Sequence, residues 1–173
     1  MTGPLLSGPG GRLVLPEPAS LLVSREDGGH LVVLPPRDVW ERSELEPEEL
    51  KQWSFLVAAA ARGMLDTLPQ LEGGCINYWE AGNWALNDAA EPVGPKTARD
   101  HRRMHLHLLG RSRTSKRAAW RWGESPRFPD FAERHTWAVG FQPLTDQECR
   151  AIVAHAVAAL TRRYGVPADA LVV

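Results

Sequence analysis

The sequence predicts an α+β domain built on an antiparallel sheet, and three observations lead to this prediction. Short strand-like runs are separated by turns, two long amphipathic helices stand apart from them, and residues 103–110 alternate between polar and apolar side chains. The 173 residues suit one domain with a sizeable core. Within it we expect an N-terminal arm at 1–19, a core at 20–111 and an aromatic-rich C-terminal extension at 112–173 that carries a terminal helix.

The first third of the chain is predicted to be an arm followed by a hairpin. Residues 1–19 hold four prolines and four glycines, which favours a loose arm with one short strand at Arg12–Leu15. Two apolar runs, Ser20–Ser24 and His30–Leu34, flank a turn, so together they predict a β-hairpin. Two prolines directly after the second run end it.

Two helices follow from caps and from apolar spacing. Pro47 begins the first, because proline is tolerated in the first turn, and Pro69 ends it. Thr145–Glu148 is a capping box that opens the second, which runs to about Tyr164 with Gly165 beyond it. The buried stripe of the first helix is broad and consists of Leu50, Trp53, Phe55, Val57, Ala61, Met64, Leu65 and Leu68.

The remaining segments divide into strands and irregular chain. Gly73–Trp79 predicts a strand, residues 80–100 a loop, and residues 102–109 a strand that contains two histidines. Residues 112–143 have no clean period but hold six large aromatic side chains. We expect this segment to be irregular and to pack against the sheet or a partner subunit.

Composition excludes several classes of protein. The net charge is −1, so no overall field favours nucleic acid as a partner. Cys75 and Cys149 lie far apart in sequence and form neither a disulfide framework nor a zinc motif. There is no apolar run long enough for a membrane span and no secretory signal pattern, so a cytoplasmic protein without membrane association is expected.

The alternating stretch is the strongest functional signal. On a strand, Arg103, His105 and His107 share one face, and His101 has the same parity. Such a row suits a site that binds negative charge and moves protons near neutral pH. The alternative is a solvated strand face that carries basic residues. Basic residues also gather between Lys96 and Arg121, which indicates a local anionic ligand or a solvated basic loop.

Four segments between Ser20 and Arg111 carry a resemblance to a known family. The hexapeptide His105-Leu106-His107-Leu108-Leu109-Gly110 is similar to the second half of a motif in which histidines alternate with apolar residues. The segments at 30–38, 44–50 and 75–77 resemble further parts of the same family, in the same order. The family is the histidine triad (HIT) family of nucleotide hydrolases and transferases. The resemblance implies an antiparallel sheet with one long central helix and a C-terminal helix.

The resemblance also implies an activity. His105 would attack the α-phosphate of a nucleotide or nucleoside phosphate and form a nucleotidyl-histidine, and His107 would donate to the phosphate oxygens. His30 and Asn77 match positions near the family's active site, although a buried, satisfied histidine is the alternative for His30. The family implies a homodimer and no cofactor or metal.

The chain departs from the family pattern at three places. Arg103 replaces the first histidine of the triad, Asp38 replaces the histidine that ends the upstream segment, and about fifteen residues are inserted before His105. Arg103 suits a phosphate but cannot shuttle protons. Asp38 is predicted to orient a histidine, to pair with Arg103, or to be a surface turn residue. His101 is a candidate for the missing triad member, with a solvated loop histidine as the alternative.

Other assignments stay open at this stage. The inserted region offers pocket residues that are equally typical of loops, namely Glu80, Asn83, Asn87 and Asp88. The replaced histidine also allows a nucleotide-binding protein that has lost catalysis. A zinc site at His101, His105 and His107, with Cys75 or a carboxylate, is a third hypothesis, and Arg103 among the ligands counts against it.

Overall fold

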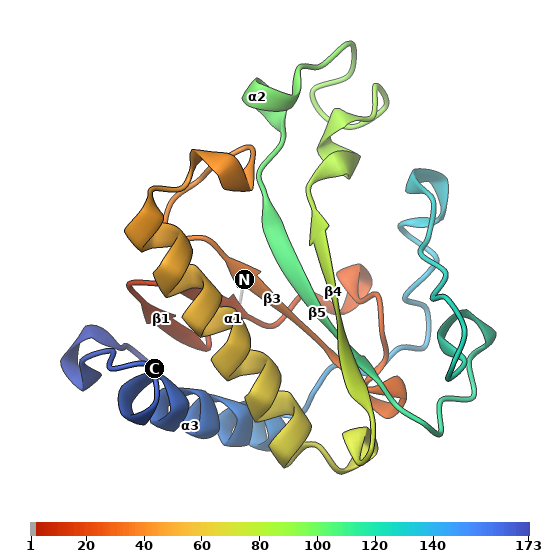
Figure 1. Ribbon diagram of the computed structural model, residues 1–173. Helices are drawn as coiled ribbons and strands as arrows, with labels where there is room; N and C mark the ends of the chain where they lie inside the picture. Colours follow the sequence, from red (N-terminus) through yellow and green to blue (C-terminus); the bar gives the residue numbers. More distant parts are fainter. Residues whose placement is uncertain (1–2) are drawn as a thin grey trace.

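Five antiparallel strands form one sheet, with a long helix packed against the C-terminal helix, so the predicted α+β class is confirmed (Figure 1). The computed structural model describes residues 3–173. The sheet order is β1-β2-β3-β5-β4. The strands are β1 (Leu6–Gly8), β2 (Gly11–Val14), β3 (His30–Leu34), β4 (Cys75–Ala81) and β5 (His105–Arg111).

The N-terminal arm is part of the sheet: β2 confirms the short strand predicted at Arg12–Leu15, whereas β1 shows that the prediction of a loose arm is wrong for residues 6–8. Strands β1 and β2 form a tight hairpin in which Leu6 lies opposite Leu13, and both side chains are fully buried. Glycine is needed at position 11, where φ is +106°. The glycines and prolines here shape a turn, and residues 1 and 2 of the predicted arm lie outside the described residues.

The predicted hairpin at 20–34 does not form. Strand β3 pairs with β2 and β5, while the run Ser20–Ser24 pairs with no strand. The backbone of Leu22 explains the difference. Its N–H donates to His30 Nδ1, and its carbonyl accepts from the indoles of Trp120 and Trp137. A residue whose N–H and C=O already bind side chains has no groups left for a sheet ladder.

Both predicted long helices are confirmed. Helix α1 spans Pro47–Thr67 and helix α3 spans Asp146–Arg162, with the predicted capping box at Thr145 and Glu148. Gly63 of α1 lies against Ile152 of α3, which lets the two helices cross closely. A four-residue helix, α2 (Ala98–His101), interrupts the region predicted as loop. Among residues 3–173, no helix is long and apolar enough to cross a membrane.

The two faces of the sheet are covered differently. Leu31, Val33, Leu106 and Leu108 point toward α1 and α3 and form the main core. The opposite face meets the irregular segment 112–143, in which Trp120 is fully buried. Figure 1 shows the helices on one side of β4 and β5 and this segment, coloured teal to light blue, on the other. The segment therefore packs against the sheet of its own chain, as one of the two predictions had it.

Gly110 provides a test of this packing. Its N–H donates to the carbonyl of Gly29 at 2.9 Å, and a Cβ at position 110 would overlap the backbone of Gly28. We expect Gly110→Ala to lower the free energy of unfolding by about 2 kcal/mol, because backbone cannot move aside as a side chain can. Urea unfolding measures this. Gly3→Ala, which adds a methyl group in open space, is the control; an equal effect of the two substitutions would contradict the packing.

Candidate functional site

The sheet register gathers three histidine rings on the face away from the long helices. His105 and His107 are two residues apart on β5, so their side chains share that face. On β3, His30 lies opposite Leu109 and is a diagonal neighbour of His107. Ring centroids are 4.9 Å apart for His30 and His107, and 4.8 Å apart for His105 and His107.

A chain of hydrogen bonds fixes the tautomers of two of these rings. The N–H of Leu22 can only donate, so His30 Nδ1, 3.1 Å away, is the acceptor. The proton of neutral His30 therefore sits on Nε2, which donates to His107 Nδ1 at 2.7 Å. Neutral His107 must then carry its own proton on Nε2. His107 thus presents a hydrogen-bond donor.

His105 has the opposite tautomer. Its Nδ1 lies 3.0 Å from the carbonyl oxygen of Arg103, which can only accept. Nδ1 therefore carries the proton, and Nε2 carries the lone pair. Neighbouring rings thus present a nucleophile and a donor.

Burial keeps all three rings neutral. Desolvation is the main cause that lowers the pKa of His30, and nearby His105 adds to it. Desolvation also lowers the pKa of His107, with His30 and His105 as further causes. For His105, burial lowers the pKa and the hydrogen bond to the Arg103 carbonyl partly opposes this. A neutral imidazole is the form that can attack an electrophile.

The two β5 histidines line a cavity of about 600 Å³. This size is ordinary for a small-molecule site. The cavity lies between the sheet and the irregular C-terminal segment, and no carboxylate side chain is among its lining residues. The lining residues are Ser20, Leu22, Trp79, Ala81, Gly82, Asn83, Trp84, Ala85, His101, Arg103, His105, His107 and Pro129.

Arg103 and His101 also line this cavity, but they are not on the strand. Strand β5 runs from His105 to Arg111, so it begins and ends later than the predicted 102–109. His101 ends helix α2, so the parity of the strand does not place it. His101 Nδ1 lies 3.1 Å from the Thr97 carbonyl. One guanidinium nitrogen of Arg103, Nη1, donates to the carbonyls of Arg102 and Arg99.

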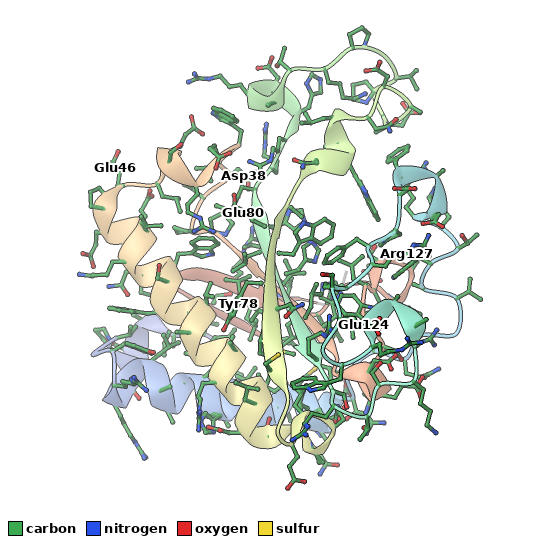
Figure 2. All side chains as sticks on the ribbon, turned by 45° about the vertical axis from the view of Figure 1, so that its right-hand side comes forward. Asp38, Glu46, Tyr78, Glu80, Glu124 and Arg127 are labelled. Atoms are coloured by element: carbon green, nitrogen blue, oxygen red, sulfur yellow. The ribbon has the colours of Figure 1, made fainter. Side chains whose placement is uncertain are left out.

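The remaining predicted site residues lie outside the cavity lining. His30 is buried behind His107 and acts through it. Asn77 is half-buried on β4, opposite Leu109 and on the face of the histidines. Asp38 is exposed, and among residues 3–173 it forms no ion pair with Arg103, so the predicted pairing is wrong. Figure 2 shows Asp38 on the same side of β4 as α1, across from Glu124 and Arg127.

The region between Glu80 and Asp88 contributes only part of what was predicted. Asn83 lines the cavity, whereas Glu80 faces α1 and pairs with Arg42 at 2.5 Å. Asn87 Oδ1 accepts from the N–H of Ala89, and the backbone carbonyl of Asp88 accepts from the N–H of Gly94, so both residues hold turns of the loop. Neither residue is part of the cavity lining.

Sequence reasoning missed three kinds of residue. Trp79 lies opposite His107 in the register and stacks on it, with ring centroids 5.3 Å apart. The alternation of β4 was a signal that could have placed it on the histidine face. Trp84 and Leu22 carried no local signal. Arg102 is 9 % exposed and joins Glu41, Glu80 and Asn83, so it anchors the loop that carries Trp84.

Comparison with known proteins adds no assignment: no protein-family model matches the chain, and no curated protein matches its sequence.

Within residues 3–173, no three His, Cys, Asp or Glu side chains gather in a group that could hold a metal ion, which counts against the zinc hypothesis. Cys75 lies exposed at the far end of β4.

The buried histidines predict acid sensitivity. An unfolded histidine binds a proton near pH 6.5, whereas the lowered folded pKa of His30 and His107 keeps them neutral. Stability from this source is complete above pH 6.5 and is lost as the pH falls below it. Between pH 7.5 and 5.5 we expect a loss of about 1 kcal/mol for each of the two histidines, measured by urea unfolding.

The matched variants are His30→Gln and His155→Gln. The first should reduce the pH-dependent loss by about half, although it also lowers stability at pH 7.5. The second removes a half-buried histidine of α3 that pairs with Asp66 of α1, outside the cavity lining, and should leave the loss intact. Equal pH dependence in wild type and His30→Gln would contradict the assignment.

Proposed function

We propose that this protein is a nucleoside-phosphate hydrolase or nucleotidyl transferase that acts at the α-phosphate through a nucleotidyl-histidine. One observation carries the proposal: adjacent neutral imidazoles present a lone pair at His105 and an N–H donor at His107 in the same cavity. A nucleophile beside a donor is what attack on a phosphate ester or anhydride requires.

Two displacements at phosphorus make up the reaction. The lone pair on His105 Nε2 attacks the α-phosphorus, a P–N bond forms, and the bond from phosphorus to the leaving group breaks, with its electron pair staying on the leaving group. The Arg103 carbonyl binds the Nδ1 proton of His105 while positive charge develops on the ring. His107 Nε2–H donates to a non-bridging oxygen. Water, or another acceptor, then attacks phosphorus, the P–N bond breaks with its electron pair returning to His105 Nε2, and the attacking oxygen releases its proton to solvent.

The fold is consistent with a HIT-like protein, and this supports the same proposal. The resemblance at 30–38, 44–50, 75–77 and 105–110 falls on β3, the start of α1, β4 and β5. Three of these segments are adjacent strands whose shared face carries the histidines. The homodimer and the cytoplasmic location remain predictions.

A second candidate function is nucleotide binding without turnover. It is favoured by Arg103, because a guanidinium at the place of the first triad histidine donates hydrogen bonds but no proton. Both functions would use the same cavity, and they differ in whether a covalent bond forms to His105. An experiment that detects a nucleotidyl-histidine therefore separates them.

The test is to detect a covalent nucleotidyl adduct on His105 by mass spectrometry. With adenosine or guanosine 5′-(p-nitrophenyl phosphate), we expect release of p-nitrophenol and a mass gain of one nucleotidyl group after an alkaline quench. His105→Ala should abolish the adduct and lower turnover at least 1,000-fold, because the nucleophile is lost. His155→Gln is the control and should match wild type. Full activity of His105→Ala would overturn the proposal, and binding without adduct or turnover would favour the second candidate.

A further inference from the structure

The carbonyl that decides the tautomer of His105 lies just beyond the sheet. At the start of β5, the register with β4 ends where Ala81 lies opposite His105, and the register with β3 ends at Leu106. The peptide between Arg103 and Met104 is therefore outside both ladders, and strand pairing does not fix its direction. Other contacts must hold the Arg103 carbonyl 3.0 Å from His105 Nδ1.

One such contact is made by the other end of the same peptide. The N–H of Met104 donates to the carbonyl of Val39 at 2.9 Å. The peptide is trans and planar, so its N–H and its C=O point in opposite directions. With the N–H held at Val39, the carbonyl of Arg103 points away from Val39, and His105 Nδ1 meets it there.

A second contact is made by the side chain of Arg102, which is buried between two segments of chain. On one side its Nη1 donates to the carbonyl of Trp40 and contacts the carboxylate of Glu41 at 3.0 Å. On the other side its Nε donates to Asn83 Oδ1 at 3.2 Å, and its Nη2 lies 3.5 Å from Glu80. The planar guanidinium thus joins the chain after β3 to the end of β4, directly before the peptide that orients His105.

Gly82 shows how closely this place is packed. A Cβ on Gly82 would lie 2.8 Å from the carbonyl oxygen of Arg103 and 2.9 Å from Cγ of Arg102. The φ of Gly82 is +131°, which side chains other than glycine rarely adopt. The end of β4 therefore bounds the Arg103 carbonyl on one side, and the side chain of Arg102 lies against the same glycine.

The charge of Arg102 has a smaller effect on His105 than the position of the carbonyl has. Burial is the largest cause that lowers the pKa of His105, and the hydrogen bond to the Arg103 carbonyl, which raises this pKa, comes next. The charges of Arg102, which lowers the pKa, and of Glu80, which raises it, are smaller causes with opposite signs. Arg102 therefore acts on His105 mainly through geometry.

We propose that Arg102 is a positioning residue for the nucleophile: the fixed fork of its guanidinium holds the Arg103 carbonyl at His105 Nδ1 and so keeps the lone pair on Nε2. The inference rests on the proposed function. Without the guanidinium the peptide between Arg103 and Met104 is free to turn, and His105 loses its acceptor. The proton then moves between the two ring nitrogens, and a neutral ring protonated at Nε2 has no lone pair there to attack phosphorus.

The first test observes the tautomers directly in the full chain. Long-range ¹H–¹⁵N spectra at pH 7.5 should place the proton of wild-type His105 on Nδ1, and those of His30 and His107 on Nε2. In Arg102→Met, which keeps the aliphatic stem, we expect a mixture of tautomers at His105 alone. The other two rings are the internal control for folding, because Leu22 fixes them from the opposite side.

The second test is kinetic and uses adenosine 5′-(p-nitrophenyl phosphate). Arg102→Met should lower kcat about 100-fold, as misplacement of a reacting group by about 1 Å does, and change KM less than about threefold, because Arg102 is outside the cavity lining. Arg102→Lys keeps the charge but not the planar fork, so its kcat should remain about tenfold below wild type. Arg99→Gln removes a nearby arginine whose side chain is 78 % exposed, and should match wild type in both tests.

A further variant reaches the same carbonyl from β4. Gly82→Ala leaves the guanidinium in place but puts a methyl group against the Arg103 carbonyl, so its spectrum should show the same change at His105 alone.

The outcomes separate the inference from the proposed function. If His105 keeps its proton on Nδ1 in Arg102→Met, if all three rings change together, or if Arg102→Lys equals wild type, the inference is overturned while the hydrolase function stands. If wild type neither turns over the ester nor labels His105, the proposed function fails, and the spectra still decide whether Arg102 positions the ring. A change at His105 alone, with a loss confined to kcat, supports both.

Discussion

The backbone of Leu22 is the point on which the site depends. Its N–H donates to His30 Nδ1, and this bond determines the tautomer of His30 and, through it, of His107. Its carbonyl accepts two indole N–H groups, from Trp120 and Trp137. The backbone of one residue therefore ties the irregular C-terminal segment, through His30, to His107, which presents a donor to the cavity. Since Trp120 is fully buried, the packing of that segment and the protonation pattern of the site depend on the same contact.

The electrostatics of the cavity follow from burial. Desolvation lowers the pKa of each of the three histidines, so the rings contribute directed lone pairs and N–H groups but no net charge at neutral pH. Trp79 covers one face of His107 and adds to its desolvation. The fixed positive charge in the lining then comes from Arg103. This division gives His105 a free lone pair and Arg103 the fixed positive charge, as the proposed reaction requires.

Local patterns predicted the parts of this arrangement that depend on neighbours in sequence. Alternation gave the shared face of His105 and His107, and caps gave the starts of α1 and α3. The run at Leu22 was misjudged because its partners lie 98 and 115 residues away, and no local pattern encodes them. Asp38 was placed at the site by resemblance alone, yet its side chain is exposed in the irregular chain after β3. His101 reaches the cavity from α2, a helix that the alternating pattern did not anticipate.

The dipeptide Arg102-Arg103 connects the loop between β4 and β5 with the cavity. Side chains of consecutive residues in extended chain point to opposite sides. Arg102 points toward Glu41 and Glu80, and through Asn83 it holds the loop that carries Trp84 against the cavity. Arg103 consequently points into the cavity, and its carbonyl orients His105. A histidine at position 103 would keep the carbonyl but lose the fixed charge. The loop anchor, the orientation of the His105 ring and the positive charge in the cavity lining are therefore set by two adjacent residues, and only the last of these three depends on the side chain of Arg103.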